Sequence, residues 1–298
     1  MIPLKSILVG VDFTSCSAAA LRQAIRIARF HHATLRVVHI LDSHVVADMK
    51  TAFPGVPEAE LHARFIQGVR RNWEQFTAAI DGAEQLEIIV KVDHPAAGLL
   101  KLTSEFAADL LVLGTHGTSP PDRGAGTTAI ACARRSRAMV LLVHDSDGQA
   151  FRSVLACVDF SETSRKALEL AAAFAQLDRA RLHVLHVFDA PWNQLHYRTE
   201  TTEASLDFQK QYTDGLMNQL QRLTESINGA TRELTIGFHL VDYGSHGAGI
   251  VKFARENNID LVVLGTRGRT NLRDLIMGST AERVLRETPC SILAVKAE

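Results

Sequence analysis

The chain has 298 residues, about twice the usual size of a domain, so two domains are expected. Apolar residues make up 46% of the chain and charged residues 22%, which is typical of a globular protein that buries large cores. The 32 Lys and Arg residues nearly balance the 33 Asp and Glu residues, so the net charge is −1. This balance argues against nucleic acids and anionic membrane surfaces as partners, because both need a cationic excess.

The four cysteines, Cys16, Cys132, Cys157 and Cys290, lie far apart and form no C-x-x-C pair. We therefore expect neither a disulfide framework nor a cysteine-rich zinc site. The first residues do not combine a charged segment with an apolar run, as a signal peptide does, and no apolar run approaches the ~20 residues of a membrane span. A cytoplasmic protein is expected.

Five short apolar runs, separated by helical patterns, follow one another in the first half of the chain. Their apolar residues are consecutive and do not alternate with polar ones, which is typical of parallel strands buried on both faces. The longest helical pattern runs from Leu61 to Ile80, with apolar residues at steps of four and three. The expected strands are Ile7–Val11, Leu35–Leu41, Leu86–Val92, Leu110–Leu113 and Met139–Val143.

The second half repeats the first. Ser6–Thr14 matches Ser153–Ser161 at an offset of 147 residues, and Asp109–Gly117 matches Asp260–Gly268 at an offset of 151. Two further pairs of segments match in the same order. Leu35–Asp42 matches Leu182–Asp189, and Gly126–Ala129 matches Gly278–Ala281. The expected strands of the second half are Val154–Val158, Leu182–Phe188, Leu234–Val241, Leu261–Leu264 and Ser291–Val295.

Four matches in one order indicate that a unit of roughly 147 residues has been duplicated. Strands that alternate with helices form right-handed crossovers and an open α/β sandwich. We therefore expect an α/β protein with two tandem, doubly wound domains of five parallel strands, residues 1–147 and 148–298. The last strands, Met139–Val143 and Ser291–Val295, would be apolar sheet edges, so we expect the two domains to pair them and to pack as a pseudo-two-fold pair.

In such sheets ligands bind beyond the carboxyl ends of the strands, where the strand order reverses. In the second half this rule selects Asp159 after the first strand, Gly265-x-x-Gly268 after the fourth, and Gly278–Thr280 at the start of the last helix. The glycines let the main chain approach a bulky anion, and the helix start offers N–H groups, its dipole and two hydroxyls to a phosphate. Asp159 would repel phosphate, so its carboxylate suits ribose hydroxyls or a base N–H.

Gly265-x2-Gly268-x9-Gly278-Ser279, after a strand that ends in Asp159, resembles the ATP-binding signature of the universal stress protein family. The resemblance extends to the opening Val-Asp-Phe-Ser/Thr, to the Leu-His-Val of the second strand and to the ending Thr288–Val295, and it covers essentially the whole chain, once per half. It implies a sheet in the order 3-2-1-4-5 and ATP or another adenine nucleotide as ligand, accompanied by Mg²⁺. In the family the last strands associate between subunits, so the duplication builds a dimer into one chain, and a further homodimer stays open.

The resemblance also assigns binding residues in the second half. Asp159 would hold the ribose or adenine end, and the main chain of Val187 would contact the adenine. The residues implied around the phosphates are Gly265, Thr266, Arg267, Gly268, Gly278, Ser279 and Thr280.

The first half departs from this pattern in one loop. Only eight residues separate Gly117 from Gly126, and two prolines stiffen the loop and remove N–H donors. The shorter loop either keeps its place or withdraws from the triphosphate, and both outcomes stay open. The corresponding first-half residues are Asp12, Ile40, Gly114, Thr115, His116, Gly117, Gly126, Thr127 and Thr128.

Three further side chains are open to more than one interpretation. His116 and its counterpart Arg267 either contact phosphate or point into solvent. Cys16 lies near a helix start, which can lower the pKa of a thiol, but a nucleophile would need a base that the sequence does not identify. The 13 histidines show no H-E-x-x-H or similar spacing, so no metal site is expected.

The chain has no G-x4-G-K-S/T motif, and no general base is evident near the expected phosphates. The leading hypothesis is an ATP-binding stress or regulatory protein whose nucleotide occupancy alters its conformation or its contacts with an unknown protein partner. One alternative is slow ATP hydrolysis or adenylate transfer at the second-half site. Another is an interaction scaffold that binds no nucleotide.

Overall fold

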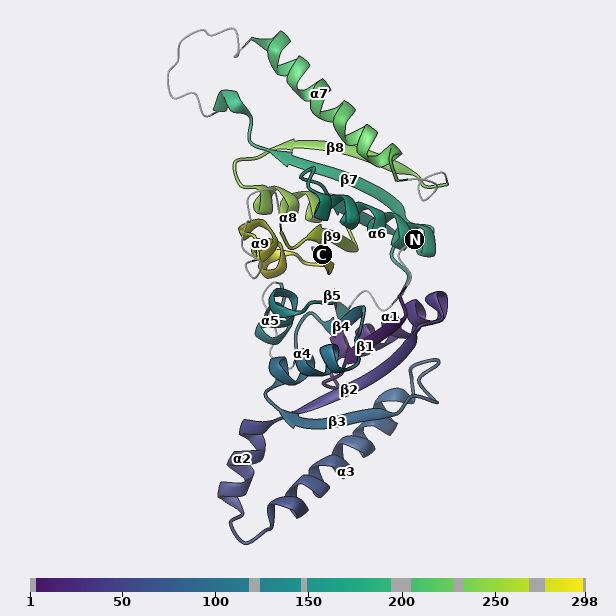
Figure 1. Cartoon of the computed structure of the whole chain (residues 1–298), viewed down its shortest axis with the longest axis vertical. Helices are drawn as coiled ribbons and strands as arrows, with labels where there is room; N and C mark the ends of the chain where they lie inside the picture. Colours follow the sequence, from purple (N-terminus) through teal and green to yellow (C-terminus); the bar gives the residue numbers. More distant parts are fainter. Residues whose placement is uncertain are drawn as a thin grey trace. The chain divides into compact units, whose positions relative to one another are not determined.

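A computed structural model of the chain, drawn in Figure 1, describes residues 4–117, 124–145, 149–193, 205–227, 233–267 and 277–296. These residues form two compact units, divided between Gln149 and Ala150. Strands and helices alternate through both units. This alternation is the pattern of an α/β fold.

The first unit contains five parallel strands in the order β3-β2-β1-β4-β5. Helices connect each strand to the next, as parallel neighbours require. The elements are β1 (Ser6–Gly10), α1 (Ser15–His31), β2 (Thr34–Asp42), α2 (Ser43–Ala52), α3 (Glu58–Thr77), β3 (Ile88–Asp93), α4 (Pro95–Glu105), β4 (Leu110–Gly114), α5 (Thr127–Arg135) and β5 (Met139–Val143).

The second unit repeats this plan in the order β8-β7-β6-β9-β10, again with parallel pairs. Both orders are the expected 3-2-1-4-5 arrangement, which is confirmed. The elements are β6 (Ser153–Cys157), α6 (Glu162–Asp178), β7 (Arg181–Phe188), the short 3₁₀ helix η2 (Pro191–Asn193), α7 (Leu206–Glu225), β8 (Ile236–Asp242), α8 (His246–Glu256), β9 (Leu261–Gly265), α9 (Ser279–Glu287) and β10 (Ser291–Val295).

Consecutive residues of the central strands are buried, so both faces of each sheet are covered. Ile7, Leu8 and Val9 of β1 are fully buried, as are Val154 and Leu155 of β6. Helix α1 packs on β1 and β4, and α6 packs in the same way on β6 and β9, whereas α4 packs on β2 and on α5. Burial of this continuous apolar surface is the main stabilising contribution to each unit.

The strand order reverses between β1 and β4 in the first unit and between β6 and β9 in the second. The pairing of β1 with β4 ends at Val9 and Val112, and that of β6 with β9 ends at Ala156 and Val263. Beyond these residues the chains diverge toward helices that lead to different parts of the sheet. A crevice at this edge follows from the topology.

The turn from the first strand to the first helix has the same structure in both units. Thr14 caps α1, its hydroxyl accepting the Ser17 N–H at 3.3 Å, and Ser161 caps α6 by accepting the Ser164 N–H at 3.2 Å. Just before each cap, Phe13 and Phe160 take positive φ values of 65° and 62°. A bulky side chain disfavours this left-handed conformation, so the fold holds each phenylalanine there against a local cost of order 1–3 kcal/mol.

Several predicted element ends lie elsewhere in the structure, such as the start of β8 at Ile236 and not at Leu234, and two of them involve tertiary contacts. The apolar pattern predicted a helix as far as Ile80, but helix α3 ends at Thr77. Ile80 lies in the turn that follows, and its side chain is buried. The third strand begins at Ile88 and not at Leu86, because the Leu86 carbonyl accepts the indole N–H of Trp73 at 3.1 Å. In both cases an apolar residue of a loop contacts the rest of the unit. Its position in the sequence therefore looks like a continuation of the neighbouring helix or strand.

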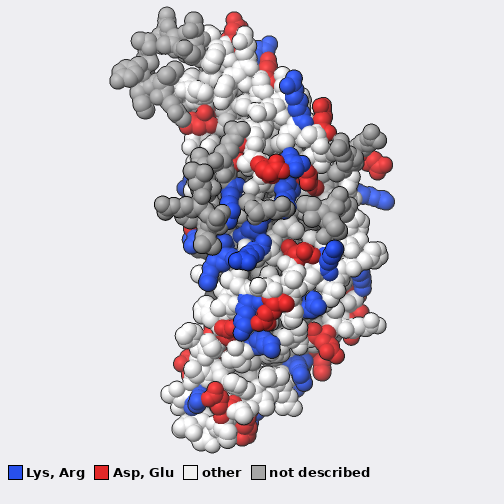
Figure 2. All heavy atoms as spheres, in the orientation of Figure 1, with Lys and Arg blue, Asp and Glu red and all other residues white. Residues whose placement is uncertain are grey.

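Figure 2 shows acidic and basic side chains intermingled on the face that it displays. Several form exposed pairs within one helix, such as Arg64 with Glu60 and Arg283 with Glu287. Pairs of this kind contribute little stability, about 0.3–0.5 kcal/mol each. Among the described residues, no helix is both long enough and apolar enough to cross a membrane. All four cysteines are buried, and none of them forms a disulfide.

Candidate functional site

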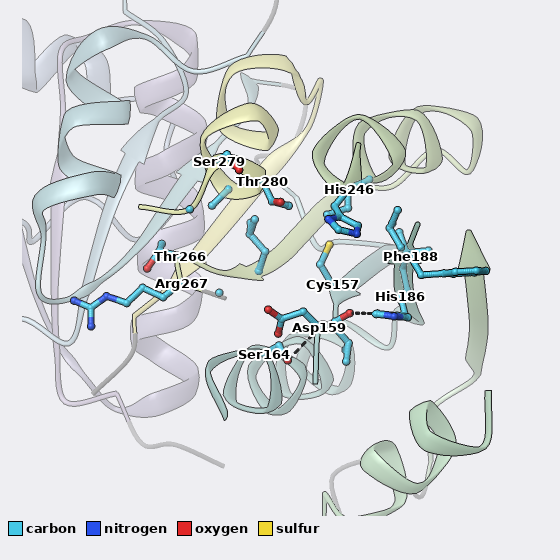
Figure 3. Close-up of a pocket in the computed structure, with 18 of the residues that line it drawn as sticks. Cys157, Asp159, Ser164, His186, Phe188, His246, Thr266, Arg267, Ser279 and Thr280 are labelled. Atoms are coloured by element: carbon cyan, nitrogen blue, oxygen red, sulfur yellow. Dashed lines mark hydrogen bonds between the residues drawn. The ribbon is translucent and has the colours of Figure 1, made fainter. Parts of the chain in front are cut away.

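A cavity of about 510 Å³ lies in the second unit, beyond the carboxyl ends of β6, β7 and β9 and against the start of α9 (Figure 3). Eight of the nine residues predicted to bind nucleotide in this half line it, and the ninth, Gly268, lies outside the described residues. The eight residues are Asp159, Val187, Gly265, Thr266, Arg267, Gly278, Ser279 and Thr280.

Asp159 lies two residues beyond the end of β6, with its carboxylate directed into the cavity (Figure 3). Its Oδ1 accepts hydrogen bonds from the N–H of Ser161, at 3.0 Å, and from the Ser161 hydroxyl. Its own N–H donates to the Ser164 hydroxyl at 3.3 Å. These bonds to the start of α6 fix the side chain, so the carboxylate is held ready to accept a hydrogen bond from a ligand.

The main chain of Val187 faces the same cavity. The Val158 N–H donates to the Leu185 carbonyl at 2.9 Å, so the main-chain groups of Leu185 point toward β6. The pairing of β6 with β7 ends at Cys157 and Leu185, while β7 continues to pair with β8 as far as Phe188. Because strand geometry alternates with period two, the N–H and C=O of Val187 point to the side where β6 has already ended. They form an open main-chain edge.

Aromatic side chains that the sequence analysis did not select form the wall beside this edge. His186, Phe188 and Tyr212 line the cavity, and the His186 and Phe160 rings lie 4.6 Å apart between centroids. The His186 Nδ1 lies 2.7 Å from the Val158 carbonyl, and since a carbonyl can only accept, Nδ1 carries a proton and donates. The matched histidines of the two halves, His39 and His186, were a signal for His186, but nothing in the sequence placed Tyr212 of α7 beside it.

The start of α9 forms the opposite, polar end of the cavity. The Gly278 N–H donates to the Thr266 carbonyl at 3.0 Å, which ties the helix start to the end of β9. No side chain among the described residues caps α9, and the N–H groups of its first turn are those of Ser279, Thr280 and Ala281. Together with two hydroxyls they make a site suited to an anion.

Two charged side chains modify this polar end. Arg267 extends away from Asp159, on the side of the cavity where Thr266 lies (Figure 3). Glu282, in the first turn of α9, would oppose a phosphate, and it is paired with Arg286 at 3.0 Å on the following turn. Glu282 does not line the cavity, whereas Arg267 does. The described lining of the cavity therefore includes one basic side chain, Arg267, together with the carboxylates of Asp159 and Asp189.

Thr266 and Gly265 line the cavity, but their contacts are with other parts of the second unit. Both the N–H and the hydroxyl of Thr266 donate to the Val295 carbonyl, at 2.9 and 3.1 Å. A Cβ on Gly265 would lie 2.8 Å from the Thr163 methyl group, so this glycine makes room for α6 and not for a ligand. The phosphate donors predicted for this loop are thus reduced to Arg267 among the described residues.

The first unit has an equivalent cavity of about 560 Å³. Asp12 is held like Asp159, its Oδ1 accepting from the Thr14 N–H at 3.2 Å and the Thr14 hydroxyl at 2.6 Å. A Cβ on Gly117 would lie 2.9 Å from the Asp12 Oδ2, so the glycine loop approaches the acid closely. All nine predicted residues line the cavity: Asp12, Ile40, Gly114, Thr115, His116, Gly117, Gly126, Thr127 and Thr128.

His116 distinguishes the first cavity from the second. Its Nε2 lies 3.4 Å from the Cys16 Sγ and its Nδ1 lies 3.0 Å from the Thr115 hydroxyl oxygen. Burial raises the pKa of the Cys16 thiol, partly offset by hydrogen bonding to Thr115, so the lowering that a helix start can cause does not prevail. The sequence pattern missed this contact because Cys16 and His116 are 100 residues apart.

The model of the universal stress protein family matches residues 3–144 and again residues 150–296. A universal stress protein of Methanocaldococcus jannaschii is 26% identical over 156 residues, 49% of this chain and 95% of that protein. The solved structure of a universal stress protein from Archaeoglobus fulgidus covers 98% of both chains with a TM-score of 0.62 and 19% identity, a likeness of fold.

A second Archaeoglobus fulgidus universal stress protein, solved in complex with dAMP, covers 50% of this chain and 100% of that chain. Its identity is 19% and its TM-score is 0.35, and the dAMP is a property of that protein. The two family matches together span nearly the whole chain, one in each unit. This chain belongs to the universal stress protein family, with two copies of the family's domain in tandem.

Proposed function

We propose that the cavity of the second unit binds an adenine nucleotide, ATP with Mg²⁺, and that its occupancy alters the conformation of the chain or its contacts with a protein partner. The observation that supports this most is the order of groups around one cavity. The open main-chain edge at Val187, the carboxylate of Asp159 and the uncapped start of α9 follow one another as a base, a sugar and a phosphate chain do. Family membership agrees with this assignment.

At the nucleoside end, a flat base would lie between the open edge of β7 and the aromatic wall. The N–H and C=O of Val187 can pair with a base edge that presents one acceptor and one donor. Adenine has such an edge. The carboxylate of Asp159 would accept from ribose hydroxyls, and a charged hydrogen bond contributes about 1.5–3 kcal/mol. His186 and Phe188 supply apolar surface beside these polar contacts.

At the phosphate end, the first turn of α9 and Arg267 would share the negative charge. Each helix-end interaction is worth only about 0.3–1 kcal/mol, so the N–H groups, the hydroxyls of Ser279 and Thr280, and the guanidinium must act together. The carboxylates among the described residues that line the cavity, Asp159 and Asp189, follow β6 and β7 at the nucleoside end. Mg²⁺ would therefore be held mainly by phosphate oxygens and water.

Calorimetric titration of the full chain with MgATP tests the proposal, with Asp159→Asn as the critical variant. Asparagine keeps an oxygen for Ser161 but loses the charge, so the Kd should rise by roughly 10- to 150-fold. Asp12→Asn makes the same change in the first unit and should leave the second-unit Kd unaltered. Absence of ATP binding by the wild-type chain, or an unchanged Kd in Asp159→Asn, overturns the proposal.

Two further measurements separate this proposal from its alternatives. Native mass spectrometry of protein purified without added nucleotide should find an adenine nucleotide retained, and an empty chain that also gives no calorimetric response would favour a scaffold. Single-turnover assays should find no ATP hydrolysis above background. Turnover that disappears in both Asp159→Asn and Ser279→Ala would favour slow hydrolysis or adenylate transfer instead.

The proposal extends to the first unit and to the state of the protein in the cell. The first-unit cavity, with Asp12 and the uncapped start of α5, is a second candidate for nucleotide. Two binding events in the calorimetric titration would support its occupancy. Four scattered cysteines that form no disulfide agree with a cytoplasmic location. Pairing of the two domains, a further homodimer and a protein partner also belong to this proposal.

A further inference from the structure

Cys16, His116 and Asp145 meet at one corner of the first unit. They come from the start of α1, from the segment after β4 and from the segment after β5. Each offers one ligand atom, and these three atoms all lie within 4.8 Å of one another. Within the described part of the chain, no other three histidine, cysteine or acidic side chains meet this closely.

The donor set is a thiol sulfur, an imidazole nitrogen and a carboxylate oxygen. Hard cations such as Mg²⁺ and Ca²⁺ take oxygen ligands, so sulfur and nitrogen together exclude them as the natural occupants. Zn²⁺ is bound by all three donor types and usually has four ligands. The chemistry of the cluster therefore fits Zn²⁺ with three protein ligands and one further position.

The distance between sulfur and nitrogen in the cluster matches tetrahedral coordination. Sulfur and nitrogen bound to one tetrahedral Zn²⁺ lie about 3.5 Å apart, given Zn–S and Zn–N lengths of about 2.3 and 2.0–2.1 Å. In the structure the Cys16 Sγ and the His116 Nε2 are 3.4 Å apart. The Cys16 Sγ also lies 3.6 Å from the His116 Nδ1, so the imidazole must turn to direct Nε2 at an ion that the sulfur also binds. The ligand atom of Asp145 lies within 4.8 Å of those of the other two residues.

Outer contacts orient the ligands as they do in known metal sites. The His116 Nδ1 lies 3.0 Å from the Thr115 hydroxyl oxygen, which leaves Nε2 for the metal. The Asp145 carboxylate is held by the Ser15 hydroxyl at 3.4 Å and lies 3.1 Å from the His144 Nδ1. Cys16 is buried, so the site would lie partly inside the unit.

We propose that the first unit binds one Zn²⁺ ion through Cys16, His116 and Asp145, with a water molecule as the fourth ligand. The ion joins the start of α1 to the ends of β4 and β5. In this proposal His116 binds the metal ion and does not contact a phosphate. The site is independent of the nucleotide proposed in the second unit.

The second unit provides an internal comparison, because its matching positions cannot form this site. Thr163 stands where the first unit has Cys16, and Arg267 where it has His116. Two residues after the last strand, the sequence has Ala297 in place of Asp145. The binding of one ion per chain is therefore expected, in the half whose glycine loop departs from the family pattern.

Cobalt(II) spectroscopy on the full, tag-free chain, treated with chelator and reductant, tests the proposal without nucleotide. Titration with Co²⁺ should produce a near-ultraviolet thiolate-to-cobalt band and intense visible bands that saturate at one equivalent, and Zn²⁺ should abolish them. Cys16→Ala should lose the thiolate band. His116→Arg, which installs the second unit's residue, should weaken binding by more than about 100-fold, since loss of an outer contact alone costs roughly 10- to 100-fold.

Cys290→Ala, which removes a buried thiol of the second unit, is the matched control and should retain every band. Circular dichroism verifies that each variant is folded. If Cys16→Ala does not fold, His116→Arg still tests the proposal. A wild-type chain without a thiolate band, or a band that persists in Cys16→Ala or in His116→Arg with unchanged affinity, overturns the proposal. Because ATP is absent, none of these outcomes depends on the nucleotide site.

Discussion

His183 and His239 lie side by side on β7 and β8 of the second unit. Their ring centroids are 5.2 Å apart and nearly parallel, with the His183 Nδ1 3.1 Å from the His239 Nε2, and Phe253 of α8 covers them. Burial, then the neighbouring His239 and the charge of Arg181, lower the pKa of His183 to about 4. Burial and Arg181 lower the pKa of His239 as well. The folded unit therefore resists protonation at this pair.

This resistance makes the stability of the unit depend on pH. In the unfolded chain His183 titrates near the ordinary histidine pKa of 6.5, so on acidification the unfolded state binds the proton first. The folded state is therefore not penalised above about pH 6.5, where His183 is neutral in both states. Its free energy of unfolding decreases as the pH falls from about 6.5 toward 4. One such group lowers the free energy of unfolding by about 2 kcal/mol between pH 7 and pH 5, and by about 3 kcal/mol below pH 4.

Replacement of His183 by asparagine removes the titrating group and keeps an amide near the position of Nδ1. Urea unfolding at pH 7 and pH 5, followed by Trp192 fluorescence in a Trp73→Phe background, reports on the second unit. The loss of stability between the two pH values should be about 2 kcal/mol smaller in His183→Asn. His32→Asn is the control, because this exposed residue has a φ of 53° that asparagine tolerates. An equal loss in wild type and His183→Asn would refute the reasoning.

Two further predictions concern residues that line the second cavity but serve the fold. Gly265→Ala should destabilise the second unit by about 1–3 kcal/mol in urea unfolding, because its Cβ would lie 2.8 Å from the Thr163 methyl group. Adding Thr163→Ser removes that methyl group and should recover part of the loss, and an undiminished loss would contradict the steric explanation. Thr266→Val should cost about 1 kcal/mol of stability by removing the hydroxyl that donates to Val295, yet change the Kd for MgATP less than twofold. A larger change in Kd would show that this hydroxyl contacts the ligand.

The fold could be predicted from sequence because its signals are local and occur twice. Consecutive apolar residues such as Ile7–Val11 are typical of a strand covered on both faces, and the second copy at Val154–Val158 repeats the pattern. The cavity could be predicted for a related reason. In a parallel sheet all carboxyl ends lie on one edge, so Asp159 and Gly278–Thr280 meet there although about 120 residues separate them.

The role of each side chain within the cavity depended on tertiary contacts. Thr266 and Arg267 are neighbours in the motif, yet the hydroxyl of Thr266 is bound to β10, whereas Arg267 lines the cavity. Tyr212 reaches the cavity from α7, a helix whose pattern indicates only which of its faces is apolar. A sequence motif specifies residue types, but hydrogen-bond partners are decided by which main-chain groups the sheet leaves unpaired.

The sequence by itself determined the duplication, the two parallel sheets and the edge at which a ligand can bind, because these follow from periodicity and strand direction along a single chain. Only the tertiary structure decided that Cys16, His116 and Asp145 converge and that His183 stacks on His239. Cys16 and His116 are 100 residues apart and His183 and His239 are 56 apart, so neither spacing nor composition distinguishes them from isolated residues. Their chemistry arises from proximity and burial, which the packing of helices on the sheet creates.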